Sequence, residues 1–435
     1  MDLYPFQVDG VEFLLNNPRA ILADEPGLGK TYQALVAARG ATLIIAPAAF
    51  KNIWSDAIEE CQQLLDPGVS FTIVSYHQVN GKSESGKLTD YLKPELNKPW
   101  STVIIDESHH LKNRKTKWTV AIFKLKTDRL YLLTGTPIPN WSHELYCLLR
   151  LLFPGDKRFT SYWRWVGTWF EAKDNPWGGQ TIGKLRDDKT WEDFAVDNGL
   201  TTHYLRRLRD DVLPDLPPLR EQTIVVDMLP KQKAVYNRVK KSNHAILESG
   251  HEILAWSTGG MYTKLHKLST GVEVEDPSSK PCSNKLSVLR ELMSDRVSDY
   301  TLVVCRFNSS VDAVCRLMDD LGISIVRVSG SVSDSDRELA VSSFQAGKVG
   351  VMVATIDTIA EGYTLTKADC VIFVERHPRP SKNEQTRRRI HRIGQVRPCL
   401  QIDIVTANSV DTKLVDLLSR KTDNQMAVLG AIDLL

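Results

Sequence analysis

The sequence predicts an α/β protein built from two parallel-sheet lobes, and two features of the 435-residue chain support this. Short apolar, β-branched runs occur in two groups and alternate with helix-like segments, as in sheets whose strands are joined by helices. A glycine-containing loop follows the first run directly, as at the start of nucleotide-binding lobes. The expected strands are 20–23, 42–46, 102–105 and 130–133 in the first group, and 301–304, 323–328, 349–354, 370–374 and 401–405 in the second.

The two groups predict two domains, an N-terminal lobe over 1–222 and a C-terminal lobe over 223–435. Trp and Leu at helical spacing indicate a helical insertion over about 141–210 in the first lobe, where the tryptophans are interpreted as packing rather than as a base-stacking platform. A second helical insertion is expected over about 228–283. The Pro-rich segment 211–218 breaks regular structure and is expected to connect the lobes.

The segment Asp24–Thr31, Asp-Glu-Pro-Gly-Leu-Gly-Lys-Thr, predicts a phosphate-binding loop between the first strand and a helix. Gly27 and Gly29 would let backbone N–H groups converge on an anion at the helix N-terminus. Lys30 would reach the β- and γ-phosphates of a nucleotide, and the Thr31 hydroxyl would hold Mg²⁺. The strict loop pattern has Gly where this chain has Asp24, so the loop alone is also compatible with a solvated turn.

A carboxylate pair completes the predicted nucleotide site. Asp106 and Glu107 come directly after the expected strand 102–105, at the sheet edge where open α/β folds bind ligands. Asp106 can hold Mg²⁺ through water, and Glu107 can polarise the water that attacks the γ-phosphate. Together with Lys30, the pair predicts a chain that binds and hydrolyses ATP.

Composition restricts the class of protein. Hydrophobic residues are 42% and charged residues 25% of the chain, values typical of globular proteins. Seven cysteines without a Cys-x-x-Cys pair favour a reducing compartment over a disulfide framework. There is neither a membrane-length apolar run nor an N-terminal signal, so a cytoplasmic, nucleoid-associated or nuclear location is expected rather than secretion or a membrane. With a net charge of only +2, nucleic-acid binding must depend on local basic clusters.

The second lobe offers arginines instead of another phosphate loop. If 385–395 is helical, Gln385, Arg389 and Arg392 share one face, because spacings of three and four residues align on a helix. An arginine presented to the γ-phosphate accelerates hydrolysis by about 10³–10⁵. The alternative is a basic helix that faces nucleic acid and takes no part in the chemistry.

These blocks, in this order, resemble the Swi/Snf-type (sucrose non-fermenting) family of superfamily-two helicase-like ATPases. The resemblance covers essentially the whole chain and implies two RecA-like lobes. Two departures concern Pro26, where the family usually has Met, and Gly362, which alone remains of a usual glycine cluster. Ser108 and the stretch that ends at Glu375 are similar to the fork-remodelling, strand-annealing subgroup. The matching segments are Tyr4–Val11, Asp24–Thr31, Ile44–Pro47, Asp106–Asn113, Leu133–Pro137, Leu205–Pro214 and His391–Gln395.

The resemblance implies a translocase that uses ATP and Mg²⁺ to move along double-stranded or forked DNA. It implies that Gln7 reads adenine and that Gln385 also belongs to the nucleotide site. Without room for a histone-reading module, repair, recombination or replication-fork work is expected, with unknown protein partners. The DNA contacts that the resemblance implies are Pro47, Trp54, Lys112, Thr134, Thr136, Arg306, Thr355 and Gly362.

Two rival functions remain open from the sequence. A strand-separating DNA or RNA helicase would share the same ATP site. A nucleotide-gated DNA-binding subunit would need no ATP turnover. The presence of Lys30, Asp106, Glu107, Arg389 and Arg392 argues against it, because such a switch could dispense with several of them.

Movement along a DNA backbone needs cations but no readout of the bases. Lys112, Arg114, Lys115 and Lys117 form a cluster suited to it, or else a solvated basic surface.

Overall fold

A computed structural model describes most of the chain. The described chain divides into two compact units, which lie within residues 1–214 and 215–420. The described residues are 2–80, 92–138, 142–174, 180–213, 216–242, 244–246, 252–254, 258–271, 283–295, 298–360 and 362–420. The second unit begins just before a strand over residues 219–226, so the domain boundary expected at 222 falls inside that strand. None of the helices in these ranges is both long and apolar enough to cross a membrane.

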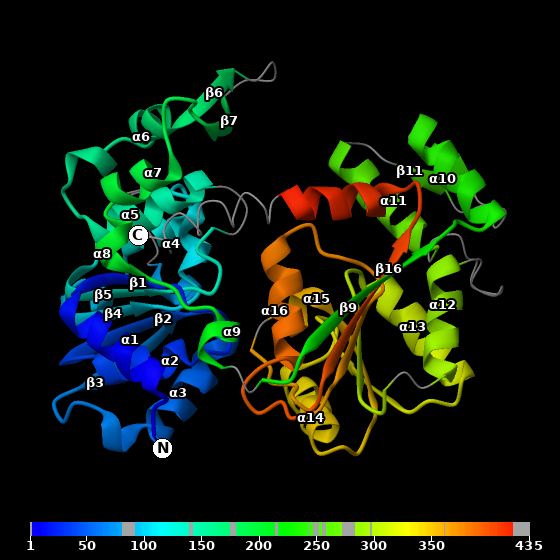
Figure 1. Ribbon diagram of the computed structural model, residues 1–435, viewed down its shortest axis with the longest axis horizontal. Helices are drawn as coiled ribbons and strands as arrows, with labels where there is room; N and C mark the ends of the chain where they lie inside the picture. Colours follow the sequence, from blue (N-terminus) through cyan, green and yellow to red (C-terminus); the bar gives the residue numbers. More distant parts are fainter. Residues whose placement is uncertain are drawn as a thin grey trace. The chain divides into compact units, whose positions relative to one another are not determined.

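The first unit is a six-stranded parallel sheet in the order β3-β2-β4-β5-β1-β8 (Figure 1). Its elements are α1 Pro5–Asn16, β1 Arg19–Leu22, α2 Lys30–Ala37, β2 Ala41–Ala46, α3 Lys51–Glu60, β3 Ser70–Ser75, β4 Pro99–Ile105, α4 Lys117–Ile122, β5 Lys126–Leu133, α5 Tyr146–Leu152, α6 Tyr162–Trp169, β6 Phe170–Asp174, β7 Gln180–Leu185, α7 Trp191–Asp197, α8 Leu200–His203, β8 Tyr204–Leu205 and α9 Arg209–Val212.

Both faces of this sheet are buried, which explains the continuous apolar runs in the sequence. Alternate residues of each strand point to opposite faces, so Ile44 belongs to the core under α1, α2 and α3, whereas Leu43 and Ile45 belong to the core under α4 to α7. In the second core Trp165 and Trp169 are each 3% exposed, which confirms that these two tryptophans serve packing.

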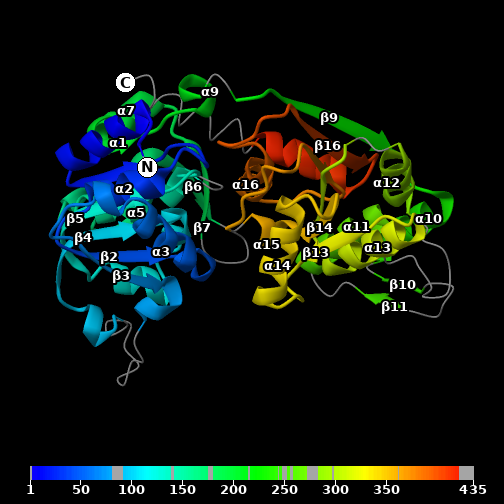
Figure 2. The same ribbon diagram turned by 90° about the horizontal axis from the view of Figure 1, so that it is seen from below.

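The second unit repeats this architecture with the strand order β13-β14-β12-β15-β16-β9, again all parallel. Figure 2 shows β9 running alongside β16 at the sheet edge. Its elements are β9 Leu219–Val226, α10 Pro230–Ser242, β10 His244–Ile246, β11 Glu252–Leu254, α11 Thr258–Thr270, α12 Asn284–Ser294, β12 Thr301–Cys305, α13 Asn308–Asp320, β13 Ile325–Val328, α14 Asp334–Gln345, β14 Val351–Thr355, α15 Ile356–Ile359, β15 Cys370–Phe373, α16 Pro380–Ile390 and β16 Cys399–Thr406.

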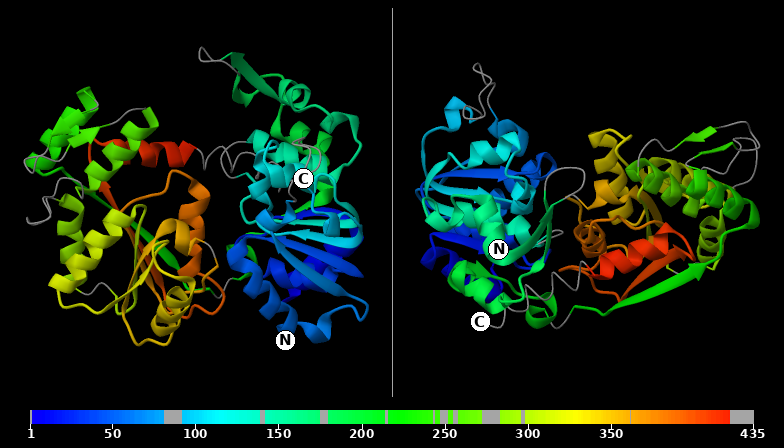
Figure 3. Two further views of the ribbon diagram at one scale, coloured as in Figure 1. Left: turned by 180° about the vertical axis from the view of Figure 1, so that it is seen from behind. Right: turned by 90° about the horizontal axis from the view of Figure 1, so that it is seen from above.

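Two parallel sheets confirm the predicted α/β fold class, but the insertions are not purely helical. Within the first, β6 and β7 form an antiparallel hairpin that projects away from the sheet of its own unit (Figure 3). Residue 141, the expected start of that insertion, lies outside the described residues. The second insertion packs α10 against α11 and includes the short hairpin β10–β11. The strands of both hairpins are only three to six residues long, so they do not form a recognisable apolar run in the sequence.

Candidate functional site

Three predicted motifs lie at the carboxyl ends of three neighbouring strands in the first unit. The phosphate loop follows β1, the carboxylate pair follows β4, and the segment Thr134–Thr136 follows β5. In the sheet β5 lies between β4 and β1. The third motif therefore sits between the other two, although it comes last in the sequence. This edge is where parallel sheets bind ligands.

The loop has the backbone conformation of a phosphate cradle. Gly27 and Gly29 have φ angles of 94° and 75°, in the left-handed region that favours glycine. A Cβ atom on Gly29 would lie 2.2 Å from Nε2 of Gln7, so another residue would displace that side chain in addition to straining the backbone. Gln7 is 2% exposed, and its Nε2 donates to the Leu28 carbonyl at 3.1 Å. Helix α1 thus braces the loop through Gln7.

Lys30 begins α2 and is folded back onto the loop. Its Nζ donates to the carbonyl oxygens of Asp24 at 2.6 Å and Glu25 at 3.2 Å. Burial lowers the pKa of Lys30, while the charges of Glu107, Asp24 and Asp106 act in the opposite direction. The ammonium group therefore lies within electrostatic reach of the carboxylate pair.

Asp24 has a structural partner that the sequence did not indicate. Its carboxylate is fully buried and forms an ion pair with Arg207, whose Nη2 lies 2.5 Å from Oδ2 and whose Nε donates to Oδ1 at 3.0 Å. Arg207 Nη2 also donates to Oε1 of Gln33 at 2.7 Å, and Gln33 donates to Asp24 at 3.1 Å. Asp24 was predicted as a nucleotide-binding residue within the segment Asp24–Thr31, but its carboxylate instead anchors the loop to the segment that contains Arg207.

Three hydrogen bonds hold Asp106 in place. Trp54 Nε1 of α3 donates to Oδ2 of Asp106 at 2.9 Å, and the Glu107 N–H donates to Oδ1 at 2.8 Å. The hydroxyl of Tyr76 donates to the Asp106 carbonyl at 2.7 Å. Glu107 has a φ angle of 48°, an uncommon conformation for a residue with a side chain.

The two carboxyl groups differ in their electrostatic environment. Burial, followed by the charge of Glu107, raises the pKa of Asp106 to about 6. Burial also acts to raise the pKa of Glu107, but the hydrogen bond and charge of His109, together with the charge of Lys30, outweigh it and lower this pKa to about 2. Both carboxyl groups are therefore mainly ionised at neutral pH, and Asp106 is the first of the pair to take up a proton as the pH falls.

His109 connects this pair to the motif after β5. Its Nδ1 lies 3.1 Å from Oε2 of Glu107, 3.1 Å from Oγ1 of Thr134 and 3.4 Å from Oγ1 of Thr136. On the other side of that motif, a Cβ on Gly135 would lie 2.6 Å from Cγ of Pro26 in the phosphate loop. The motif after β5 thus contacts both the carboxylate pair, through His109, and the phosphate loop, through Pro26.

Two of the predicted DNA contacts in this unit are wrong. Trp54 and Thr134 are both 0% exposed, so neither offers a surface to DNA. Trp54 instead orients Asp106, and Thr134 belongs to the His109 contact chain. Pro47, Thr136 and Lys112 keep partial exposure, and Nζ of Lys112 lies 3.8 Å from Glu144.

In the second unit the predicted arginines lie together, but not on one helical face. Helix α16 ends at Ile390, so Arg392 lies beyond it and the expected helical register is wrong at that position. Arg389 donates to the carbonyl oxygens of Ala360 and, at 3.3 Å, of Tyr363. Arg392 donates to Oγ1 of Thr364 at 2.9 Å. Both arginines are thus held on the segment around Gly362.

The remaining predicted residues of the second unit are mostly enclosed. Gln385 on α16 and Thr355 at the end of β14 are each 6% exposed. Thr355 Oγ1 is 2.8 Å from Oγ1 of Thr358, which leaves it little surface for DNA. Gly362 has a φ angle of 88°, so this turn requires glycine. Arg306 is half-buried directly after β12.

Residues that position Arg306 were missed in the sequence. Glu375 is 1% exposed, and its Oε2 accepts the backbone N–H of Arg306 at 2.8 Å. Nη1 of Arg306 lies 2.8 Å from Nδ1 of His266 on α11, and Nε2 of that histidine lies 3.4 Å from Asp411. Burial lowers the pKa of His266, so its ring is neutral and Nδ1 accepts a hydrogen bond from the guanidinium group. No short-range pattern links these residues, which are up to 145 positions apart.

The fold and the site together define a two-lobed, helicase-like protein with a lysine-bearing phosphate loop. Residues 6–270 match the model of the SNF2-related domain, and residues 284–394 match that of the helicase conserved C-terminal domain. The chain belongs to the SNF2-related family, as the sequence motifs predicted.

Two curated relatives and one solved structure illustrate the similarity. The DNA annealing helicase and endonuclease ZRANB3 of Mus musculus is 28% identical over 455 residues, which cover 96% of this chain and 40% of the relative. The SWI/SNF-related matrix-associated actin-dependent regulator of chromatin subfamily A-like protein 1 of Xenopus tropicalis is 27% identical over 437 residues, 97% of this chain and 44% of the relative. The chain thus spans less than half the length of these relatives.

The similar structure is the Sulfolobus solfataricus SWI2/SNF2 ATPase core in complex with dsDNA. It is 21% identical, with a TM-score of 0.42, and the match covers 99% of this chain and 94% of that one.

Proposed function

We propose that this chain hydrolyses ATP and uses the energy to move along double-stranded DNA, in repair, recombination or replication-fork remodelling. The observation that carries the proposal is the convergence of Lys30, Asp106 and Glu107 at one sheet edge, linked through His109 to the motif after β5. A protein that only bound the nucleotide would not need the contact that His109 makes between Glu107 and the motif after β5.

The residues present fit ATP with Mg²⁺. Gly27 and Gly29 have the positive φ angles of a turn in which backbone N–H groups can converge on phosphate oxygens, and Lys30 supplies a cation there. Carboxylate and hydroxyl oxygens are the ligands that Mg²⁺ prefers, so Asp106 and Thr31 would hold the ion. When bound, Mg²⁺ would neutralise charge on the phosphates.

Glu107 is proposed to orient and polarise the attacking water. With its pKa lowered to about 2, it stays ionised and serves better as a fixed charge than as a strong proton acceptor. Phosphoryl transfer depends mainly on positioning and charge stabilisation, so this role suffices. Arg389 and Arg392 are the proposed arginine fingers, and Gln7 and Gln385 the proposed contacts to the rest of the nucleotide.

The decisive experiment compares two substitutions in the full chain. Lys30→Ala should abolish tight ATP binding, whereas Glu107→Gln should keep binding and lower kcat by at least about 10²-fold. Wild-type hydrolysis should rise with duplex DNA and fall steeply with salt, because phosphate contacts release counterions. A salt-insensitive rate, or stimulation by RNA alone, would contradict the proposal.

The rival strand-separating helicase is distinguished by its product. A translocase displaces the third strand of a DNA triplex without separating the duplex, whereas a helicase separates the two strands of a duplex. Measuring both activities on matched substrates decides between them: unwinding without triplex displacement would favour the rival. Stimulation by forked DNA beyond that by blunt duplex would support fork remodelling.

A further inference from the structure

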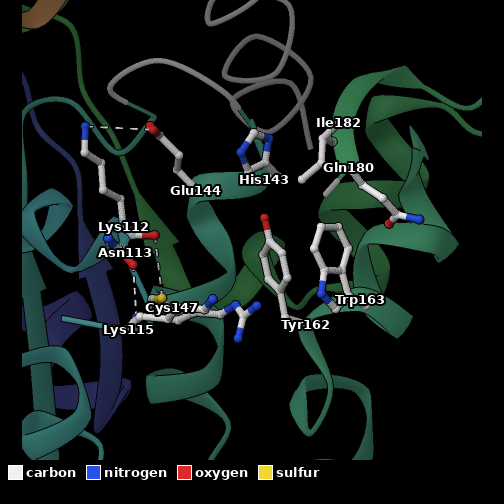
Figure 4. A pocket seen from close by; sticks show the side chains of 11 residues that line it. Lys112, Asn113, Lys115, His143, Glu144, Cys147, Tyr162, Trp163, Gln180 and Ile182 are labelled. Atoms are coloured by element: carbon white, nitrogen blue, oxygen red, sulfur yellow. Dashed lines mark hydrogen bonds and ion pairs between the residues drawn. The ribbon is translucent and has the colours of Figure 1, made fainter. Parts of the chain in front are cut away.

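The first unit contains a cavity that the nucleotide site does not use. It has a volume of about 420 Å³ and lies between the segment after the carboxylate pair, the first residues of α6 and the hairpin strand β7 (Figure 4). The segment that forms one wall, from Lys112 to Lys115, begins five residues after Glu107. Cavities of about 300–1,000 Å³ are the size in which proteins bind small ligands.

One side of the cavity is aromatic. The rings of Tyr162 and Trp163 have centroids 5.1 Å apart at 68°, and Figure 4 shows both among the side chains that line the cavity. Trp163 is 45% exposed, whereas its neighbours Trp165 and Trp169 on the same helix are each 3% exposed. A large, rigid ring left in solvent next to a cavity is a surface on which another flat ring can stack.

Basic side chains also line the cavity. Lys112, Arg114 and Lys115 line the cavity together with a single carboxylate, that of Glu144. The Arg114 guanidinium lies 4.6 Å from the centre of the Tyr162 ring, which fixes a cation beside the aromatic wall. Lys115 is exposed. A ligand suited to this cavity therefore combines a flat apolar ring with an anionic group.

We propose that this cavity holds one unstacked nucleotide of an unpaired DNA strand, with its base against Trp163 and its phosphate near Lys115. The inference rests on the proposed function, because it takes DNA as the ligand of this chain. A duplex keeps its bases stacked and cannot fill the cavity. Single strands and fork arms can, so the cavity gives the protein a preference for DNA with unpaired nucleotides.

The test compares three variants of the full chain. Trp163→Ala removes the stacking surface, Trp163→Phe keeps an aromatic ring, and Val196→Ala is the matched control, since Val196 is 56% exposed on α7 and outside the cavity. The probe is a fluorescein-labelled oligothymidylate, titrated by anisotropy at fixed salt. Trp163→Ala should weaken binding about tenfold, Trp163→Phe less than about threefold, and Val196→Ala not at all.

A second comparison tests the cation. Lys115→Ala should weaken oligothymidylate binding and reduce the slope of log affinity against log salt by about 0.7, the value for one phosphate contact to a single strand. Lys124→Ala, which changes an exposed lysine of the same unit outside the cavity, should leave both unchanged. Thermal melts of all variants confirm that they are folded.

Hydrolysis assays separate this inference from the proposed function. Trp163→Ala should lose the extra stimulation by forked DNA and keep the stimulation by blunt duplex. Unchanged oligothymidylate affinity in Trp163→Ala, or an equal loss with forked and blunt DNA, overturns the inference. A wild-type protein without duplex-stimulated hydrolysis refutes the proposed function instead, and the anisotropy titration still tests the cavity by itself.

Discussion

Removing Arg207 tests whether the phosphate loop depends on a buried ion pair. The Asp24 carboxylate is 0% exposed, and the side chain of Arg207 is 14% exposed. Arg207→Ala leaves this carboxylate without its cation and also removes the donor to Gln33. Breaking a buried pair from one side costs about 3–5 kcal/mol, because the remaining charge stays buried.

That magnitude converts into a measurable shift. For a domain of this size 1 kcal/mol lowers Tm by about 2–4 °C, so the first unit should melt about 6–20 °C earlier in Arg207→Ala. Arg158→Ala is the control, since Arg158 pairs with Asp156 at the surface with 49% of its side chain exposed, and such pairs contribute less than about 1 kcal/mol. Adding Asp24→Asn to Arg207→Ala should recover part of the loss, because a neutral amide costs less to bury than a carboxylate.

The assay is thermal unfolding followed by circular dichroism, with ATP affinity measured on the same samples. Loss of the ion pair should weaken ATP binding as well, because Asp24 lies at the start of the loop that holds Lys30. A Tm within about 2 °C of the wild-type value would refute the reasoning. So would a further loss of stability on adding Asp24→Asn.

Three further predictions concern the contacts around the site. His109→Ala should lower kcat about tenfold with little change in ATP affinity, in a steady-state assay, because it disconnects Glu107 from the motif after β5. Since burial and the charge of Glu107 raise the pKa of Asp106 from 3.8 to about 6, the folded protein binds this proton more tightly than the unfolded chain. This proton stabilises the folded state below pH 4, and the stabilisation is lost as the pH rises towards 6. The affinity for ATP with Mg²⁺ should change in the opposite direction: measured by titration, it should fall about tenfold per pH unit below 6, because protonated Asp106 cannot bind the ion. His266→Leu should raise the DNA concentration for half-maximal stimulation of hydrolysis several-fold, with basal hydrolysis unchanged, because Arg306 loses its acceptor at 2.8 Å.

Much of the fold could be predicted because it depends on local pattern. The central strands of both sheets are buried on two faces, so they appear in the sequence as unbroken apolar runs. The edge strands β3 and β9 are half-exposed, with patterns such as Leu-Arg-Glu-Gln-Thr-Ile-Val-Val, and were missed. The end of α16 was also missed, because the basic run continues past Ile390 without a strong stop signal.

The site shows the same division between local and distant interactions. Lys30 comes at the end of the glycine-containing loop after β1, and Asp106 and Glu107 directly follow β4, so local sequence pattern located all three. Whether a motif residue faces solvent or the interior depends on partners far away in the chain. Trp54 is turned inward by Asp106, which lies 52 positions further on, and Asp24 is neutralised by Arg207, 183 positions further on. Such pairings arise only when the sheet brings the strand ends together.

The inward fold of Lys30 has a consequence for selectivity. Its ammonium group donates to two main-chain oxygens, at 2.6 Å and 3.2 Å. A ligand must replace the carbonyl oxygens of Asp24 and Glu25 before it can bind the ammonium group of Lys30. Weakly charged molecules cannot do so, whereas a polyphosphate offers full negative charges and stronger, charge-assisted bonds. We therefore expect the loop to bind polyphosphates in preference to nucleosides and monoanions, without any steric gate.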